Sequence, residues 1–339
     1  MRGCSMAEVA LSGLSKAFGA TRAVQDVTMT IPDGAFVVLL GPTGAGKTTM
    51  LRLVAGLERP DAGDVRIGGR SVVADTPAQR DVAMVFQQYS LYPHMTVREN
   101  LAFPLRSPML AWDAGRIARK VGEVAEVLRI AHKLDNKATQ LSGGEMQRVS
   151  IGRALVRAPR IYLMDEPLSS LDAKLRAGLR VELKRIHAEL GATFLYVTHD
   201  QTEAMTMASH VGVLDQGRLV QFGTPRAIYE SPVSTYVASR LGQPRINILP
   251  ANLFGAPPMG AVLMGLRPEH IRVGEGAAAT VHRVERLGDQ TRLHLDLGPH
   301  RIVTLADPHA PVEAGQAVAV RPQNPLWFDA SGARIEARP

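Results

Sequence analysis

The chain has 339 residues, enough for two domains, and its 45% hydrophobic and 21% charged residues are typical of globular proteins with a sizeable core. No run of 18 or more apolar residues occurs, so we expect no membrane-spanning helix. The net charge of +7 divides into +5 over residues 1–239 and +2 over residues 240–339. This even spread, without a basic stripe or tail, argues against a nucleic-acid partner.

The N-terminal segment bears on localisation. Residues 1–6 lack the apolar core of a signal peptide, and the single cysteine, Cys4, cannot form an internal disulfide. We therefore expect the chain to stay in the reducing cytoplasm.

The first predicted elements are strands. Val27, Met29 and Ile31 alternate with polar residues, a period of two that predicts an antiparallel edge sheet. Residues 35–40 are all apolar and predict a buried strand that runs directly into a glycine-rich loop. From Lys47 onward the apolar residues have helical spacing, so the order is strand, loop and helix.

This loop is the first candidate for chemistry. Its glycines let backbone N–H groups face phosphates, and the start of a helix favours the same negative charge. We expect Lys47 to reach the β- and γ-phosphates of ATP and the Thr48 hydroxyl to ligate Mg²⁺. The full pattern in this context favours a nucleotide site over a chance turn. The predicted nucleotide-binding residues here are Gly41, Pro42, Thr43, Gly44, Ala45, Gly46, Lys47, Thr48 and Thr49.

Two aromatic or polar positions near this region have alternative interpretations. Phe18 could stack on the adenine ring or could be an ordinary core aromatic. Gln87 follows the short apolar stretch 84–86, where it could touch both the metal and the attacking water. A lone glutamine at a strand end is more usually polar surface, so this assignment depends on its context.

A helical pattern between residues 100 and 136 predicts a helical insertion, with one face formed by Ile117, Val121, Val124, Val127 and Leu128. It is followed by Leu-Ser-Gly-Gly-Glu at residues 141–145 and another helical pattern. Ser142, Gly143 and Gly144 would form a second anion-binding helix start. One ATP rarely needs both starts from one molecule, whereas two antiparallel copies would satisfy two ATP symmetrically.

Asp165 and Glu166 follow the predicted buried strand 161–164. We expect Asp165 to hold Mg²⁺ through water and Glu166 to polarise the attacking water as general base. His199 follows the strand at 193–197 and could donate a hydrogen bond to the γ-phosphate, although a single strand-end histidine is more often structural. Strands alternating with helices predict an α/β fold with a largely parallel sheet.

The amino-acid composition and the hydrophobic pattern change near residues 235–245. Lysine is absent from 240–339, and residues 291–297 alternate strictly between polar and apolar. Short strands at 301–303 and 317–320 are also predicted. Together they indicate a small all-β barrel or sandwich.

Taken together, the glycine-rich loop, the Leu-Ser-Gly-Gly segment and the Asp-Glu pair resemble the ATP-binding-cassette ATPases over residues 7–240. Segments 85–97, 165–172 and 265–270 are similar to the maltose/glycerol-phosphate type of importer ATPase. The resemblance implies a P-loop nucleotide-binding domain at 7–238, with an antiparallel β subdomain and a helical subdomain at about 88–158. An OB/TOBE-like β domain would follow at 239–339.

The resemblance also implies roles and partners. Phe18 would stack on adenine, Gln87 would be the coupling-loop glutamine, Asp172 the dimer-loop aspartate and His199 the switch histidine. Two copies, binding ATP and Mg²⁺, would lie at the cytoplasmic face of the inner membrane beneath two permease subunits, and permease helices would dock beside residues 88–94. An extracytoplasmic solute-binding protein would deliver a sugar, a polyol or a related carbohydrate. Glu145 stands where the family most often has glutamine, and we expect ATP binding at Ser142 and Gly144 to survive this change.

Other functions fit parts of the pattern. Oxyanion, iron and polyamine importers also carry a small C-terminal β domain. A soluble cassette protein acting on ribosomes or DNA would usually fuse two cassettes or insert long coiled coils, and neither occurs here. A phosphate-loop kinase would lack Leu-Ser-Gly-Gly and would need an acceptor site.

Overall fold

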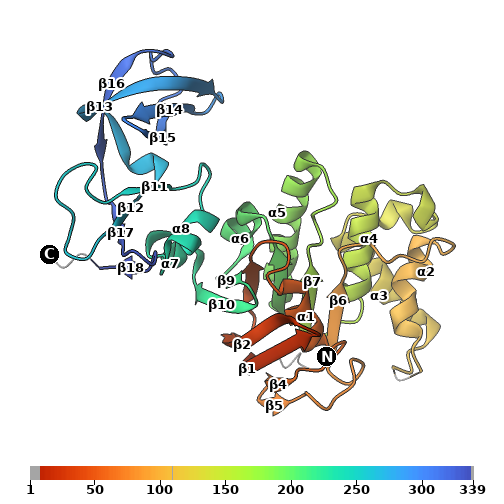
Figure 1. The fold of residues 1–339 in the computed structure, drawn as a ribbon. Coiled ribbons are helices and arrows are strands. Elements are labelled where there is room, and N and C mark those ends of the chain that lie inside the picture. The colour runs from red at the N-terminus through yellow and green to blue at the C-terminus, as the bar shows by residue number, and fades with distance from the viewer. Residues whose placement is uncertain (1–7, 109, 337–339) are drawn as a thin grey trace. The chain divides into compact units, whose positions relative to one another are not determined.

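The computed structural model describes residues 8–108 and 110–336, so the two N-terminal features that favour the cytoplasm lie outside the described residues. The chain divides into two compact units, one ending at Pro225 and the other beginning at Arg226 (Figure 1). Among the described residues, no helix is both long enough and apolar enough to cross a membrane.

A six-stranded sheet forms the centre of the first unit, with the strand order β10-β9-β3-β8-β7-β6. All neighbouring pairs are parallel except β9 and β10, so the predicted parallel α/β sheet is confirmed. Its three central strands are buried along their whole length, which explains their continuous apolar sequences. The strands are β3 (Phe36–Leu40), β6 (Val82–Val85), β7 (Ile161–Asp165), β8 (Thr193–Thr198), β9 (His210–Asp215) and β10 (Arg218–Gly223).

A four-stranded antiparallel sheet, in the order β2-β1-β4-β5, is the second sheet of this unit. The alternation at Val27, Met29 and Ile31 buries these side chains on one face of β2, as predicted. Helix α1 (Lys47–Ala55) shares one buried apolar cluster with both sheets through Met50 and Leu51. The strands are β1 (Val9–Phe18), β2 (Thr21–Ile31), β4 (Ala62–Ile67) and β5 (Arg70–Ser71).

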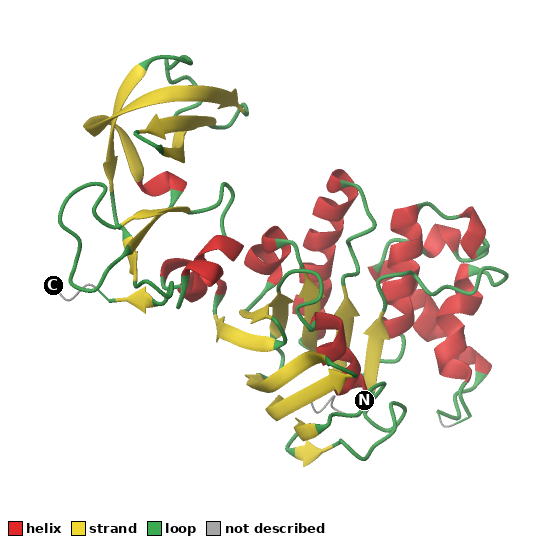
Figure 2. Ribbon diagram, in the orientation of Figure 1, coloured by secondary structure: helices red, strands yellow, loops and turns green. Residues whose placement is uncertain are grey.

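Helices make up the segment between β6 and β7, which lies apart from the antiparallel sheet (Figure 2). On the predicted inner face of this segment, Val121, Val124 and Leu128 are buried, whereas Ile117 and Val127 are only partly buried. The elements here are α2 (Val97–Ala102), α3 (Ala114–Val127), α4 (Gly143–Leu155) and the short 3₁₀ turns Phe103–Arg106, Ala131–Lys133 and Ala138–Gln140. Helices α5 (Ala173–Leu190) and α6 (Gln201–Met207) follow β7 and β8.

The second unit contains two four-stranded antiparallel sheets, ordered β11-β12-β17-β18 and β15-β14-β13-β16. The alternating residues 291–297 form β14 and bury every second side chain, as predicted. The strands are β11 (Asn247–Pro250), β12 (Leu263–Leu266), β13 (Ile271–Arg286), β14 (Thr291–Leu297), β15 (His300–Ala306), β16 (Ala317–Pro322), β17 (Leu326–Phe328) and β18 (Arg334–Ile335). Two short helices precede them, α7 (Pro225–Glu230) and α8 (Thr235–Arg240), and a 3₁₀ turn covers Pro268–His270.

Helix α8 belongs to the second unit, and a buried arginine of that unit accounts for its packing. The side chain of Arg267 is 2% exposed and donates hydrogen bonds to the carbonyls of Tyr229, Ala238 and Leu241. Its guanidinium also stacks 3.8 Å from the centre of the Tyr229 ring. These contacts tie the segment after α7 to the strands that follow.

Candidate functional site

The glycine-rich loop joins β3 to α1, as the sequence predicts. Gly46, at the start of the helix, has a φ of 95°, and a Cβ atom there would lie only 2.2 Å from the carbonyl oxygen of Ala23. Only glycine fits this position without strain. The loop therefore lies against strand β2, which contains Ala23.

The N-terminus of α1 lacks the side-chain cap that most other helices have. A Ser, Thr or Asp side chain accepts a hydrogen bond from the first turn of α2 to α6 and of α8, whereas Gly46 offers α1 none. The first N–H groups of a helix need partners, and an anion can supply them. The start of α1 therefore fits a phosphate group.

Lys47 is the buried cation of this loop. Its side chain is 5% exposed, and Nζ donates hydrogen bonds of 3.0 Å to the carbonyl oxygens of Gly41 and Pro42. Nζ also lies 3.4 Å from Oε1 of Glu166. A buried ammonium group that is held mainly by backbone carbonyls can exchange those bonds for phosphate oxygens.

Thr48 and Asp165 form the second contact between the loop and the sheet. The Thr48 hydroxyl donates a 2.9 Å hydrogen bond to Oδ1 of Asp165, which ends strand β7. Burial raises the pKa of the Asp165 carboxyl, although this hydrogen bond opposes the shift. A hydroxyl and a carboxylate oxygen side by side match the oxygen ligands that Mg²⁺ prefers, so these residues fit the metal.

Glu166 lies between the side chains of Lys47 and His199. Oε2 is 2.9 Å from Nδ1 of His199, which follows β8, while Oε1 faces Lys47. Its backbone has a φ of 42°, a conformation that is unusual for a residue other than glycine, asparagine or aspartate. Such strain is concentrated at functional sites, because surrounding structure must hold it in place.

The structure therefore brings five predicted residues into one cluster: Lys47, Thr48, Asp165, Glu166 and His199. The remaining loop residues surround it, with Gly41 and Ala45 buried and Thr43 and Gly44 exposed.

Ser142 begins α4, in the helical segment, whereas Lys47 begins α1 against the sheet (Figure 1). The Ser142 hydroxyl caps α4 and bonds to Glu145. Gly144 is buried, and a Cβ atom there would lie 2.6 Å from Cδ2 of Leu175 on α5, so a larger residue would require that side chain to shift. In the described part of the chain, the Ser142 side chain thus bonds within its own helix and not to the Lys47 cluster.

The other predicted residues also lie outside the Lys47 cluster. Phe18 ends β1 with 45% of its surface exposed, so the alternative that it is a core aromatic is wrong. Lys16 Nζ lies 5.3 Å from the centre of its ring. Gln87 is exposed after β6, and Asp172 caps α5 by accepting a 2.9 Å hydrogen bond from the backbone of Leu175.

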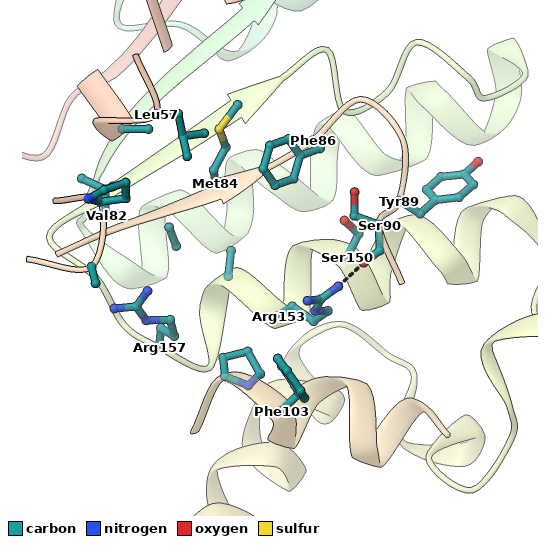
Figure 3. Close-up of a pocket in the computed structure, with 16 residues that line it drawn as sticks. Leu57, Val82, Met84, Phe86, Tyr89, Ser90, Phe103, Ser150, Arg153 and Arg157 are labelled. Carbon is teal, nitrogen blue, oxygen red and sulfur yellow. Dashed lines mark hydrogen bonds between the residues drawn. The ribbon is translucent and has the colours of Figure 1, made fainter. Parts of the chain in front are cut away.

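An apolar pocket of about 340 Å³ lies in the first unit, and Tyr89 and Ser90 of the expected docking segment 88–94 are among the residues that line it. Figure 3 shows Met84 and Phe86 from the β6 region lining it together with Phe103. Arg153 of α4 donates a hydrogen bond to the carbonyl of Ser90 and stacks 4.7 Å from the Tyr92 ring. Phe86 and Phe103, which the sequence does not single out, are both exposed here, and exposed apolar side chains gathered in one place are typical of docking surfaces.

Comparison with known proteins gives two family matches. The ABC transporter family model matches residues 24–169, and the TOBE domain model matches residues 264–327. The chain is 47% identical to the sn-glycerol-3-phosphate import ATP-binding protein UgpC of Ruegeria pomeroyi, over 85% of this chain and 86% of that protein. It is 44% identical to the UgpC protein of Cupriavidus pinatubonensis, over 98% of this chain and 100% of the relative. It is also 42% identical to the sulfoquinovosyl glycerol transport ATP-binding protein SmoE of Agrobacterium fabrum, over 97% of this chain and 99% of that protein.

Solved structures agree with this result. A dimeric bacterial ABC transporter cassette matches with a TM-score of 0.58 and 29% identity, over 64% of this chain and 99% of that chain. A dimeric post-hydrolysis cassette bound to ADP and Pi matches with a TM-score of 0.57 and 30% identity, over 64% and 99%. The resemblance, the fold class and the ATPase activity predicted from the sequence are thereby confirmed. The chain belongs to the ATP-binding-cassette ATPases, as an ABC transporter ATP-binding protein with a C-terminal TOBE domain.

Proposed function

We propose that this chain is the ATPase subunit of an importer for glycerol-containing or related carbohydrate solutes, and that it works as a homodimer holding two Mg-ATP. The relatives named above carry sn-glycerol-3-phosphate or sulfoquinovosyl glycerol in their names, and both solutes contain glycerol. The observation that carries the ATPase assignment is the cluster around Glu166, in which one carboxylate faces both Lys47 and His199.

Within this cluster, Lys47 would exchange the carbonyls of Gly41 and Pro42 for the β- and γ-phosphates. The uncapped N–H groups at the start of α1, after Gly44 and Gly46, would bind the same phosphates. Thr48 and Asp165 would hold Mg²⁺, with Gln87 completing the set when its exposed loop approaches. When bound, Mg²⁺ would neutralise charge on the phosphate oxygens.

Glu166 would accept the proton of the attacking water, because its carboxylate lies at the strand end beside the proposed phosphate position. His199 would hold that carboxylate in place and donate a hydrogen bond toward the γ-phosphate. Phe18, exposed at the end of β1, would stack on the adenine ring.

The second copy would complete each site. Ser142, Gly143 and Gly144 would approach the γ-phosphate of ATP that is bound by the partner, and Asp172 would lie at the same seam. The chain has two separate helix N-termini suited to binding phosphate, at Lys47 and at Ser142, and this supports the arrangement. In a twofold dimer, each ATP would contact one N-terminus from each copy. ATP that bridges both copies favours the closed dimer by differential binding.

The apolar pocket beside β6 would receive a cytoplasmic helix from a permease subunit. It is lined by Phe86 and Phe103 and lies next to the loop that carries Gln87 (Figure 3). A helix docked there would therefore move when this loop moves on closure of the ATP-bound dimer. We place the subunit at the cytoplasmic face of the inner membrane, beneath two permeases served by an extracytoplasmic binding protein. Residues 7–238, with the helical subdomain at about 88–158, would form the nucleotide-binding domain, and 239–339 the β domain.

Uptake by the reconstituted complex tests the function. Import of sn-glycerol-3-phosphate or sulfoquinovosyl glycerol that depends on ATP and on Glu166 is expected. The panel should also contain maltose, polyols, oxyanions, iron and polyamines. Uptake of only an oxyanion, iron or a polyamine would contradict the carbohydrate assignment and leave the ATPase assignment intact.

A further inference from the structure

A carboxylate occupies the helix start that is proposed to meet the partner's ATP. Glu145 lies in the first turn of α4, and its Oε2 accepts 2.8 Å hydrogen bonds from both the backbone N–H and the hydroxyl of Ser142. The hydrogen bonds from Ser142 lower the pKa of the Glu145 carboxyl, as does Lys133, so the group is ionised at neutral pH. A negative charge thus lies one hydrogen bond away from the proposed phosphate ligand.

One lysine lies on the other oxygen of this carboxylate. Nζ of Lys133 is 3.2 Å from Oε1 of Glu145, and the two side chains are 30% and 25% exposed. Lys133 ends the 3₁₀ turn Ala131–Lys133, which is fixed by backbone hydrogen bonds from Lys133 to Ile130 and from Asn136 to Lys133. The backbone that carries Lys133 is therefore fixed by bonds outside α4, and its side chain reaches across to the carboxylate on α4.

The Glu145 carboxylate and a phosphate bound at the shared site would both be negatively charged. A phosphate that accepts a hydrogen bond from the Ser142 hydroxyl would lie within a few ångströms of the Glu145 carboxylate. Like charges at this separation repel, and the field at the start of a helix offsets only part of the repulsion. A cation on the far oxygen of the carboxylate cancels its charge and leaves the helix start attractive to an anion.

We propose that Lys133 is a positioning residue for the shared ATP site, acting through Glu145. Its ammonium group offsets the charge of the carboxylate through Oε1, so that Ser142 can turn its hydroxyl toward the ATP bound by the partner copy. The proposal rests on the proposed function, because it assumes that Ser142 meets this ATP. It assigns to Lys133 a role in assembling the dimer, without contact between Lys133 and the nucleotide.

The test measures dimer formation driven by Mg-ATP in the full-length chain carrying Glu166→Gln, which is expected to trap the closed dimer. Light scattering over a range of ATP concentrations gives the concentration at half-maximal dimerisation. We expect Lys133→Met to raise this concentration about five- to tenfold. Lys133→Arg keeps the charge and is expected to match the parent chain.

The decisive variant is the double substitution. Glu145→Gln removes the charge that Lys133 neutralises, so Lys133→Met together with Glu145→Gln is expected to return the half-maximal ATP concentration to within about twofold of the parent. Lys120→Met is the matched control, because Lys120 is also 30% exposed and pairs with Glu123 on α3. Thermal unfolding of each monomer checks that the fold is retained.

Two results would overturn the inference while leaving the shared site intact. Lys133→Met could behave like Lys120→Met, or the double variant could be as defective as Lys133→Met. A parent chain that stays monomeric at saturating Mg-ATP would instead overturn the shared site itself, and the inference with it.

Discussion

Nδ1 of His199 lies 2.9 Å from Oε2 of Glu166, so the histidine after β8 is in hydrogen-bond contact with the carboxylate after β7. The parallel sheet makes this contact possible, because β7 and β8 are neighbours whose carboxyl ends meet at one edge. Glu166 is mostly covered, with 16% of its side chain exposed, whereas His199 is 56% exposed. An incoming γ-phosphate would therefore meet the imidazole first, and the carboxylate would lie behind it.

Replacing Glu166 with glutamine tests the proposed base. Glutamine keeps the size of the side chain and removes its ability to accept a proton, so we expect ATP binding to persist and hydrolysis to fall at least about 100-fold. The closed dimer should accumulate with unhydrolysed ATP. Steady-state phosphate release and size measurements check both parts, and turnover near that of the parent chain would contradict the role of Glu166.

Replacing Ser142 with arginine tests the second helix start. The larger side chain would block the seam, so we expect turnover to be lost while the isolated monomer binds ATP with unchanged affinity. Because Ser142 also caps α4, this change removes about 1 kcal/mol of stability as well.

Ser142→Asn separates the two effects, since asparagine caps helices as well as serine does. We expect Ser142→Asn to keep the free energy of unfolding and still to lose most of its ATPase activity. Equal loss of monomer ATP binding in Ser142→Arg would argue against a site shared between subunits.

His199→Ala is expected to reduce kcat about 100-fold with little change in thermal stability. The side chain is more than half exposed, so its removal leaves no buried gap. His309→Ala, at an exposed position in the second unit, is the matched control and should retain full activity. An unchanged kcat in His199→Ala would show that its contact with Glu166 is structural.

Asp165 links stability to pH. Burial raises the pKa of the Asp165 carboxyl in the folded chain, so folding favours the protonated form over the ionised form. The stability that the protonated carboxyl contributes is therefore present at low pH and is lost as the pH rises through the folded-state pKa. We expect Asp165→Asn to raise the free energy of unfolding of the nucleotide-free chain at pH 7, and this gain to shrink toward pH 4. Urea unfolding across this range measures it.

The same variant should lose the stabilisation that Mg-ATP gives the parent chain, because the metal ligand is gone. A variant that is less stable than the parent at pH 7, or that is fully stabilised by Mg-ATP, would contradict this account of Asp165.

Arg80 supports α1 from its far end. Its side chain is 2% exposed, and Nη1 donates hydrogen bonds of 2.7 Å and 3.0 Å to the carbonyls of Leu53 and Val54. We expect Arg80→Met to lower the free energy of unfolding by about 2 kcal/mol, because these carbonyls would be left buried without partners. Arg70→Met, at an exposed position paired with Asp75, should change it by less than about 1 kcal/mol.

Much of the site could be predicted because its residues lie next to strongly patterned strands. The apolar runs before Gly41 and Asp165 identify buried parallel strands, and such strands place their following residues at one sheet edge. The left-handed conformation of Glu166 and the buried role of Arg80 could not be predicted in this way. Both depend on contacts with residues far away in the sequence.

The second unit shows the same limit. Strand β14 was recognisable from its strict alternation, but the 16-residue strand β13 was not. Gly274 and Gly276 interrupt its pattern with φ values of 126° and 109°, and the pairing with β16 shifts between Val273 and Ala277. A bulge of this kind breaks the period of two, so the sequence resembles a turn where the structure has a strand.

The most direct test of the shared-site mechanism is a structure of the full-length Glu166→Gln chain with Mg-ATP. We expect a twofold dimer in which each γ-phosphate lies within about 3 Å of Lys47 Nζ from one copy and of Ser142 Oγ from the other. ATP bound to a monomer, or a dimer in which Ser142 still bonds only to Glu145 and faces away from the phosphate, would contradict it.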